Sequence, residues 1–134
     1  MKSLLLIPIL TLFFIPCSHG SSTFNDSLLI GTWKGTSICQ IKPSACHDEI
    51  AVYHVSKGEK PGIYHIVANK IVNGKEEDMG VDDFIFNPAD HSLFCFDEKY
   101  KVILKFTGKG KSMNGTLELE NKVYRVIKLE KISQ

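Results

Sequence analysis

The chain has 134 residues, of which 43% are hydrophobic and 23% charged, so a single folded domain is expected and a disordered chain is excluded. Lysine and arginine together number 16 and aspartate and glutamate 15, which gives a net charge of +1 at pH 7. Because the numbers of positive and negative residues are almost equal, we do not expect nucleic acid as a partner or electrostatic binding to anionic membranes.

The first 20 residues have the pattern of a cleaved signal peptide. Lys2 precedes an apolar stretch over residues 4–16, and the small residues Ser18 and Gly20 stand third from last and last before the expected cut. This stretch of about 13 residues is too short to span a bilayer, which needs about 20. We therefore expect a secreted or periplasmic protein, cut after Gly20, with no membrane span.

Cys17 offers an alternative to simple export, namely a lipid anchor on its thiol. Pro16 argues against this anchor, because a small residue is required before an acylated cysteine. Residues 21–28 are short and polar, and they are expected to form a flexible entry segment. The folded domain is expected to cover residues 29–131.

Eight short apolar or alternating runs follow, and turn residues separate them. The runs cover residues 29–38, 49–56, 62–71, 77–87, 91–97, 100–107, 111–120 and 122–130. Asn73-Gly74, between the third and fourth runs, is a typical two-residue hairpin turn. Because closing such a sheet removes two exposed edges, we predict an all-β, closed, eight-stranded antiparallel up-and-down barrel. A two-sheet sandwich is the alternative.

Three cysteines remain after cleavage at Gly20. Cys39 and Cys46 bracket a short loop that contains proline, and an oxidising compartment favours a local disulfide between them. Zinc-binding pairs usually stand two to four residues apart, so this longer interval argues against a zinc site. Cys95 lies in an apolar run and is expected to be a buried, unreactive thiol.

Arg125 is an exception on the apolar face of the last run, where Val123 and Ile127 flank it. A buried arginine needs hydrogen-bond acceptors or an aromatic face. Trp33, the only tryptophan, lies in the first run, which neighbours the last run in a closed barrel. We therefore expect Arg125 to stack on Trp33 and close the barrel floor; the alternative is that Arg125 reaches solvent near a strand end.

The string Gly31-Thr32-Trp33-Lys34 early in the first run, with Arg125 late in the last, resembles the calycin superfamily of lipocalins, fatty-acid-binding proteins and avidins. The resemblance covers the barrel ends only, and the helical lid of fatty-acid-binding proteins has no counterpart. It implies a barrel that can hold a small apolar molecule. The string Cys46-His47-Asp48-Glu49 is also similar to small secreted proteins with no assigned activity.

The cystine loop and the polar residues after it are expected at one mouth of the barrel, where binding residues usually lie. Small inward residues would leave space, and aromatic ones would line or fill it. The candidate mouth and binding residues are His47, Asp48, Glu49, Tyr53, Tyr64, Phe94, Phe96, Phe106 and Met113. His54 and His65 would bind a metal only in a register that sets them face to face, and the acidic residues 76–83 lack calcium-loop spacing.

The sequence holds no nucleophile motif, phosphate-binding glycine loop or zinc-protease motif. We therefore expect no catalysis, no cofactor and no metal. The leading hypothesis is a secreted, monomeric, lipocalin-like protein that binds a small, mostly apolar molecule. The alternative is a protein-binding module, such as an inhibitor of a secreted hydrolase, that acts through the loop at 39–48 or the arm at 21–27. An interior below about 100 Å³ would exclude the small ligand, because binding pockets have about 300 Å³ or more.

Overall fold

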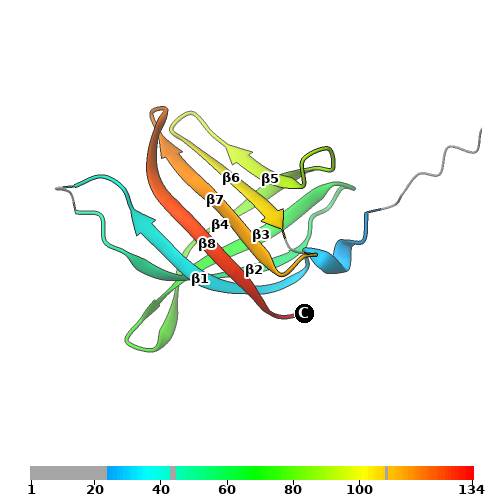
Figure 1. Cartoon of the computed structure of the whole chain (residues 1–134), viewed down its shortest axis with the longest axis horizontal. Coiled ribbons are helices and arrows are strands. Elements are labelled where there is room, and N and C mark those ends of the chain that lie inside the picture. The colour runs from blue at the N-terminus through cyan, green and yellow to red at the C-terminus, as the bar shows by residue number, and fades with distance from the viewer. Residues whose placement is uncertain (1–23, 43–44, 108) are drawn as a thin grey trace, which may run out of the picture.

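The computed structural model describes residues 24–42, 45–107 and 109–134, so the expected signal peptide and Cys17 lie outside the described residues. The elements are a short 3-10 helix η1 (Asp26–Leu28) and the strands β1 (Gly31–Cys39), β2 (Glu49–Lys57), β3 (Ile63–Val72), β4 (Lys75–Asn87), β5 (Ser92–Phe96), β6 (Tyr100–Thr107), β7 (Ser112–Leu119) and β8 (Lys122–Ser133). Each strand pairs antiparallel with the next, and β8 pairs with β1 (Figure 1). The predicted closed barrel is confirmed, and each predicted run overlaps its strand.

The two ends of the barrel differ. η1, the start of β1 and the end of β8 lie at one end, here called the helical end. The loop between Cys39 and Cys46 and the β3–β4, β5–β6 and β7–β8 turns lie at the other, the loop end (Figure 1). The predicted Asn73-Gly74 hairpin is confirmed, since both residues have positive φ, 51° and 78°, as a type I′ turn requires.

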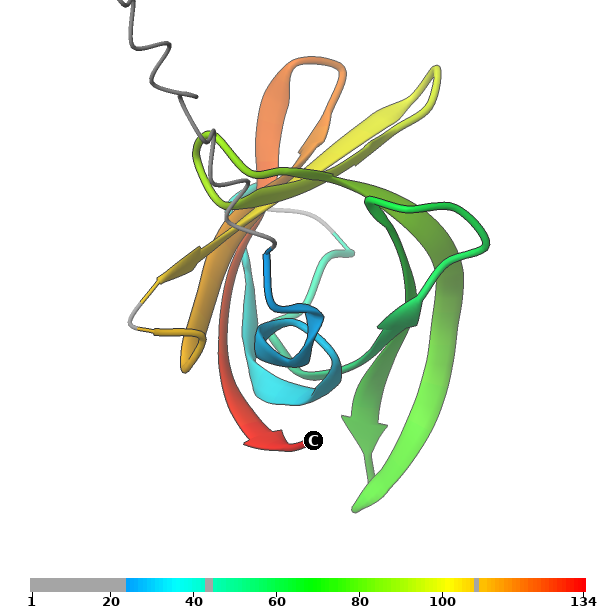
Figure 2. The same cartoon turned by 90° about the vertical axis from the view of Figure 1, so that its right-hand side faces the viewer.

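η1 and the residue after it close the helical end of the barrel (Figure 2). Leu29 is fully buried, and its carbonyl oxygen accepts a hydrogen bond of 2.8 Å from the indole Nε1 of Trp33. The ring of Phe24 packs on Phe86 with 4.3 Å between centroids. Phe24 and Leu28 are partly buried and pack against the core, while the flexibility of residues 21–28 stays a prediction.

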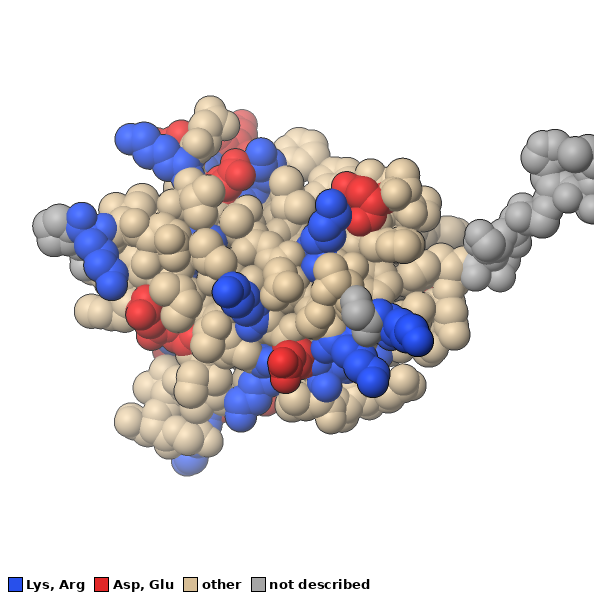
Figure 3. All heavy atoms as spheres, in the orientation of Figure 1, with Lys and Arg blue, Asp and Glu red and all other residues tan. Residues whose placement is uncertain are grey.

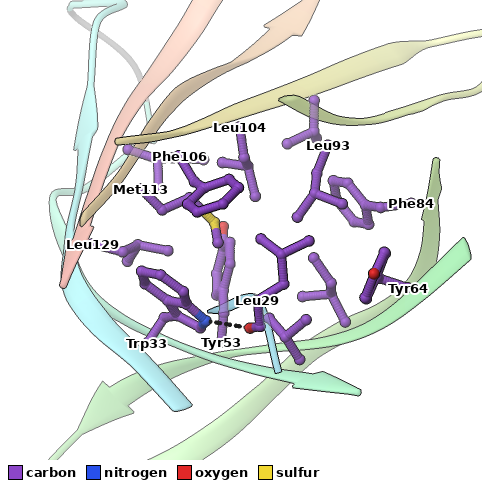
Figure 4. Close-up of a cluster of buried hydrophobic side chains, with 14 of the residues drawn as sticks. Leu29, Trp33, Tyr53, Tyr64, Phe84, Leu93, Leu104, Phe106, Met113 and Leu129 are labelled. Carbon is purple, nitrogen blue, oxygen red and sulfur yellow. Dashed lines mark hydrogen bonds between the residues drawn. The ribbon is translucent and has the colours of Figure 1, made fainter. Parts of the chain in front are cut away.

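Large side chains fill the barrel interior (Figure 4); Leu29 comes from the residue after η1, and the others come from the inward faces of strands. The fully buried ones are Leu29, Trp33, Ile66, Leu93, Leu104, Met113, Ile127 and Leu129. Burial of such a side chain stabilises the fold by roughly 1.5–3 kcal/mol. This core holds β1 and β8 together from the inside.

A β-bulge near the start of β8 changes which side chains of this strand face the barrel interior. Leu117 pairs with Arg125 and Glu118 pairs with Val123, so Tyr124 is an extra residue in β8. Alternation along the sequence predicts Val123 and Arg125 on one inward face. Instead Val123 is 41% exposed, while Tyr124 and Arg125 both face the interior.

Replacing Leu29 by alanine tests the importance of the helical end. Leu29→Ala leaves a cavity in a fully buried site, so we expect the free energy of unfolding to fall by about 2–5 kcal/mol in urea denaturation. Ile132→Ala, at a position 58% exposed, is the control and is expected to change it by about 0.5 kcal/mol or less. Equal losses in the two variants would contradict the described closure.

Candidate functional site

A cavity of about 360 Å³ lies inside the loop-end half of the barrel. Most of its wall is apolar, and a few polar side chains are grouped on β1, β2, β4, β6 and β8. The lining residues are Ser37, Glu49, Tyr53, Ile66, Ala68, Met79, Gly80, Asp82, Phe84, Tyr100, Val102, Leu117, Leu119, Tyr124, Arg125 and Ile127. The volume lies within the usual range for a small-molecule site.

Short side chains leave this half of the barrel hollow. Ala68 lies on β3 opposite Gly80 of β4, and a Cβ atom at Gly80 would meet no atom within 4 Å. Gly35 and Gly115 act differently. A Cβ atom at Gly35 would lie 1.9 Å from the carbonyl oxygen of Lys128, so this glycine permits close strand approach instead.

Arg125 and Glu49 form a largely buried ion pair in the cavity wall. The Nη1 atom of Arg125 lies 3.4 Å from Oε2 of Glu49, and the side chains are only 14% and 18% exposed. Nη1 also donates to the His47 carbonyl oxygen at 3.0 Å and to the carbonyl and hydroxyl oxygens of Ser37 at 3.3 Å each. The arginine therefore ties β8 to β1 and to the residues that precede β2.

The expected stacking of Arg125 on Trp33 is wrong. In the β1–β8 pair, Arg125 lies opposite Cys39, and Trp33 lies opposite Lys131. Nζ of Lys131 is 5.5 Å from the centre of the Trp33 ring and donates to the carbonyl oxygens of Ser27 and Leu28. A cation does cover the indole, but the antiparallel register supplies it from the end of β8.

Tyr53, a buried residue, brings a hydroxyl group to the cavity wall. The residue is 7% exposed, its ring points into the barrel (Figure 4), and its hydroxyl has no hydrogen-bond partner in the described part of the chain. Burial raises the pKa of Tyr53 to about 12, and nearby Glu49 adds to this while Arg125 opposes it. The hydroxyl is therefore a protonated donor throughout the physiological pH range.

Asp82 and Tyr100 form a second polar pair in the wall of the cavity. The Tyr100 hydroxyl donates to Oδ1 of Asp82 at 3.0 Å. Burial first, and Asp82 second, raise the pKa of Tyr100. In the sequence, Asp82 was considered only among the acidic residues 76–83 and only as a calcium ligand. Its spacing from Phe84 and Phe86, two and four residues on, is the signal that could have placed it on the inward face.

Seven of the nine predicted binding residues divide into three groups. Glu49 and Tyr53 line the cavity. Tyr64, Phe106 and Met113 are buried in the helical-end half and fill it. The prediction that Phe94 and Phe96 line or fill the barrel interior is wrong, because their side chains face outward.

Phe94 and Phe96 lie on the outer face of β5. Their rings stack at 6.3 Å between centroids, and Phe96 is 67% exposed. The interior positions of β5 belong to Leu93, which is buried, and to Cys95, which is partly buried and free. Burial raises the pKa of the Cys95 thiol, in keeping with a little-reactive group. Both faces of this five-residue strand are apolar, so alternation could not orient it.

The predicted disulfide Cys39–Cys46 is confirmed, with 5.9 Å between the Cα atoms. It holds the loop beside the cavity mouth, where Oδ1 of Asp48 accepts from the backbone N–H of Cys39 at 2.9 Å. His47 is exposed, and its contact with the site is through its carbonyl oxygen. The mouth predicted from residues 47–49 therefore lies next to the cavity.

The two histidines considered as metal ligands each meet a carboxylate on the outer surface. His54 Nε2 lies 2.7 Å from Glu76, and His65 Nδ1 lies 2.8 Å from Asp83. Among the residues that the structure describes, no three His, Cys, Asp or Glu side chains are arranged to hold a metal ion. On the face drawn in Figure 3, acidic and basic side chains are interspersed.

The fold and cavity together define a closed antiparallel β-barrel with a hollow half. No protein-family model matches the sequence, and a comparison with curated proteins finds no match. No helix in the described ranges is long and apolar enough to cross a membrane.

The Arg125–Glu49 ion pair can be tested with a double-mutant cycle. Arg125→Met and Glu49→Gln each remove the closest opposite charge from a largely buried side chain, so we expect each to lower the free energy of unfolding by about 1–3 kcal/mol. Combining both changes is expected to cost less than the sum of the single changes, as measured by urea denaturation. Strict additivity would show that the pair does not interact.

The raised pKa of Tyr53 predicts a loss of stability at high pH. Between pH 10.0 and about pH 12 the unfolded chain loses the Tyr53 proton while the folded chain keeps it. Stability is therefore full below pH 10 and falls by about 1.4 kcal/mol per pH unit above it. Tyr53→Phe removes this contribution, so the unfolding free energy of the unmodified protein, taken relative to that of Tyr53→Phe, is expected to fall across that window. A constant difference would show that Tyr53 titrates normally.

Proposed function

We propose that this protein is an exported, non-catalytic, lipocalin-like carrier that binds a small, mostly apolar molecule inside its barrel. The observation that carries the proposal is the cavity of about 360 Å³ in the loop-end half. Its volume exceeds the roughly 300 Å³ typical of small-molecule pockets. A barrel filled by its own side chains would have left no such space.

The walls of the cavity support an apolar ligand. Ile66, Phe84, Val102, Leu117 and Ile127 present hydrocarbon to it from five different strands. When an apolar molecule enters, its surface and the surface of the cavity wall are both removed from water. This burial contributes roughly 25 cal/mol per Å² to the binding free energy, before the costs of binding are subtracted. The few polar groups would orient the ligand.

The arrangement of the polar groups supports binding over catalysis. Arg125 and Glu49 interact with each other, and Asp82 accepts from Tyr100. Tyr53 is held protonated, which makes it a poor base. These groups can hold and orient a molecule, while a nucleophile would need an adjacent base to activate it.

Kinship with the calycin superfamily belongs to the same proposal. The closed eight-stranded barrel and the buried Trp33 near the start of β1 support it. The disulfide suits an extracellular or periplasmic location. Inhibition of a secreted hydrolase through the loop at 39–48 is the alternative that a failure of ligand binding would favour.

Fluorescence titration with prodan, a small neutral dye whose emission shifts in apolar surroundings, tests the proposal. We expect prodan to bind, and we expect Ala68→Phe to weaken binding at least about tenfold, which corresponds to about 1.4 kcal/mol. Ala68 lines the cavity, so the added ring occupies the space that the dye needs.

Val67→Phe is the matched control for this experiment. Val67 is the preceding residue of β3 and lies between His54 and Val81, on the outer face of the sheet. It is expected to leave prodan affinity within about twofold, which is small beside a tenfold loss. Thermal melting of both variants checks that each is folded. If prodan does not bind the unmodified protein, or binds both variants equally, the cavity is not its site.

A further inference from the structure

The charged groups of the cavity leave it with a net negative charge. Among the described lining residues, Glu49, Asp82 and Arg125 carry the formal charges, so two carboxylates face one guanidinium. Their side chains are at least partly removed from water, where charges act more strongly than at a surface. Lys70, whose Nζ lies 3.9 Å from Oε1 of Glu49, is not part of the lining, so an anionic ligand inside the cavity would face more carboxylates than cations.

Arg125 is poorly placed to receive a carboxylate. Its Nη1 atom is already surrounded by oxygens of Ser37, His47 and Glu49. Glu49 lies 3.4 Å from that atom and neutralises the charge that would attract a second anion. A ligand carboxylate beside Arg125 would lie next to Glu49, and like charges so close repel each other.

Two tyrosines of the cavity lining, Tyr53 and Tyr124, have hydroxyl groups without a hydrogen-bond partner in the described part of the chain, and Tyr53 is the more deeply buried of the two residues. The Tyr53 hydroxyl is protonated and borders the open cavity. A ligand oxygen that accepts its proton replaces the water that otherwise hydrates this hydroxyl, so the ligand binds without leaving the donor unpaired. Carbonyl and hydroxyl oxygens can accept in this way, whereas an ammonium group cannot.

We infer that the cavity selects uncharged ligands whose hydroxyl or carbonyl oxygen accepts a hydrogen bond from Tyr53, and that it discriminates against carboxylates of the same size. This inference rests on the proposed function and specifies its ligand class. Ammonium compounds are disfavoured as well, because Glu49 and Asp82 already have donors in Arg125 and Tyr100, and a buried ammonium would lose its hydration.

A series of compounds with eight carbons tests the inference: octanol, methyl hexyl ketone, octanoate and octylammonium. All four have the same number of carbons, so differences in affinity report mainly on the polar group. At about pH 7.5 the acid is ionised and the amine protonated, since their pKa values lie far below and far above it. By isothermal titration calorimetry with the full chain, we expect the alcohol and the ketone to bind at least about tenfold more tightly than either charged compound.

Tyr53→Phe removes only the hydroxyl and is expected to weaken octanol and ketone binding about fivefold or more. Tyr64→Phe makes the same chemical change outside the cavity and is expected to leave these affinities within about twofold. Circular dichroism of both variants checks that they are folded. This pair separates the loss of a ligand contact from a general effect of removing a phenol oxygen.

Each possible result decides between the proposals. Octanoate binding as tightly as octanol, or Tyr53→Phe binding octanol as well as the unmodified protein, overturns the inference and leaves the carrier function standing. Prodan binding without octanol binding also overturns the inference alone. If neither prodan nor any of the four compounds binds, the proposed function itself fails.

Discussion

The pairing of β1 with β8 is the constraint on which the rest of the structure depends. It closes the sheet, so that no strand edge remains along this seam, and it creates an interior. The same register gives the two ends of the barrel different chemistry. Lys131 lies opposite Trp33 at the helical end, and Arg125 lies opposite Cys39 at the loop end. Lys131 covers the Trp33 ring at the helical end, and Arg125 supports the cavity mouth at the loop end.

The barrel interior is divided by side-chain size. Near the helical end, Leu29, Trp33, Phe106 and Met113 fill the space and leave no room for a ligand. Near the loop end, Ala68 and the glycine opposite it project little into the interior. The filled half supplies stability and the hollow half supplies a site, so the proposed carrier function does not require the core to be weakened.

The polar groups of the cavity are arranged as pairs, which affects what a ligand can do there. Arg125 meets Glu49, and Tyr100 meets Asp82, so four of the groups are already partnered when the cavity is empty. Among the described residues of the lining, buried Tyr53 keeps a hydroxyl donor that no side chain occupies. A site of this kind rewards a ligand for one well-placed oxygen and penalises a charge, because the surroundings cannot pair with it at low cost.

The regular spacing of short apolar runs determined the strand count, the closed barrel, the hairpin at Asn73 and the local disulfide, because these depend on residues close in sequence or on alternation within a strand. The face of β5, the bulge at Tyr124 and the partner of Trp33 were decided only by the tertiary structure. Register joins residues far apart in the chain, and a shift of a few residues exchanges every partner along a strand pair. The cavity depends in turn on those partners, since its walls come from strands that only closure brings together.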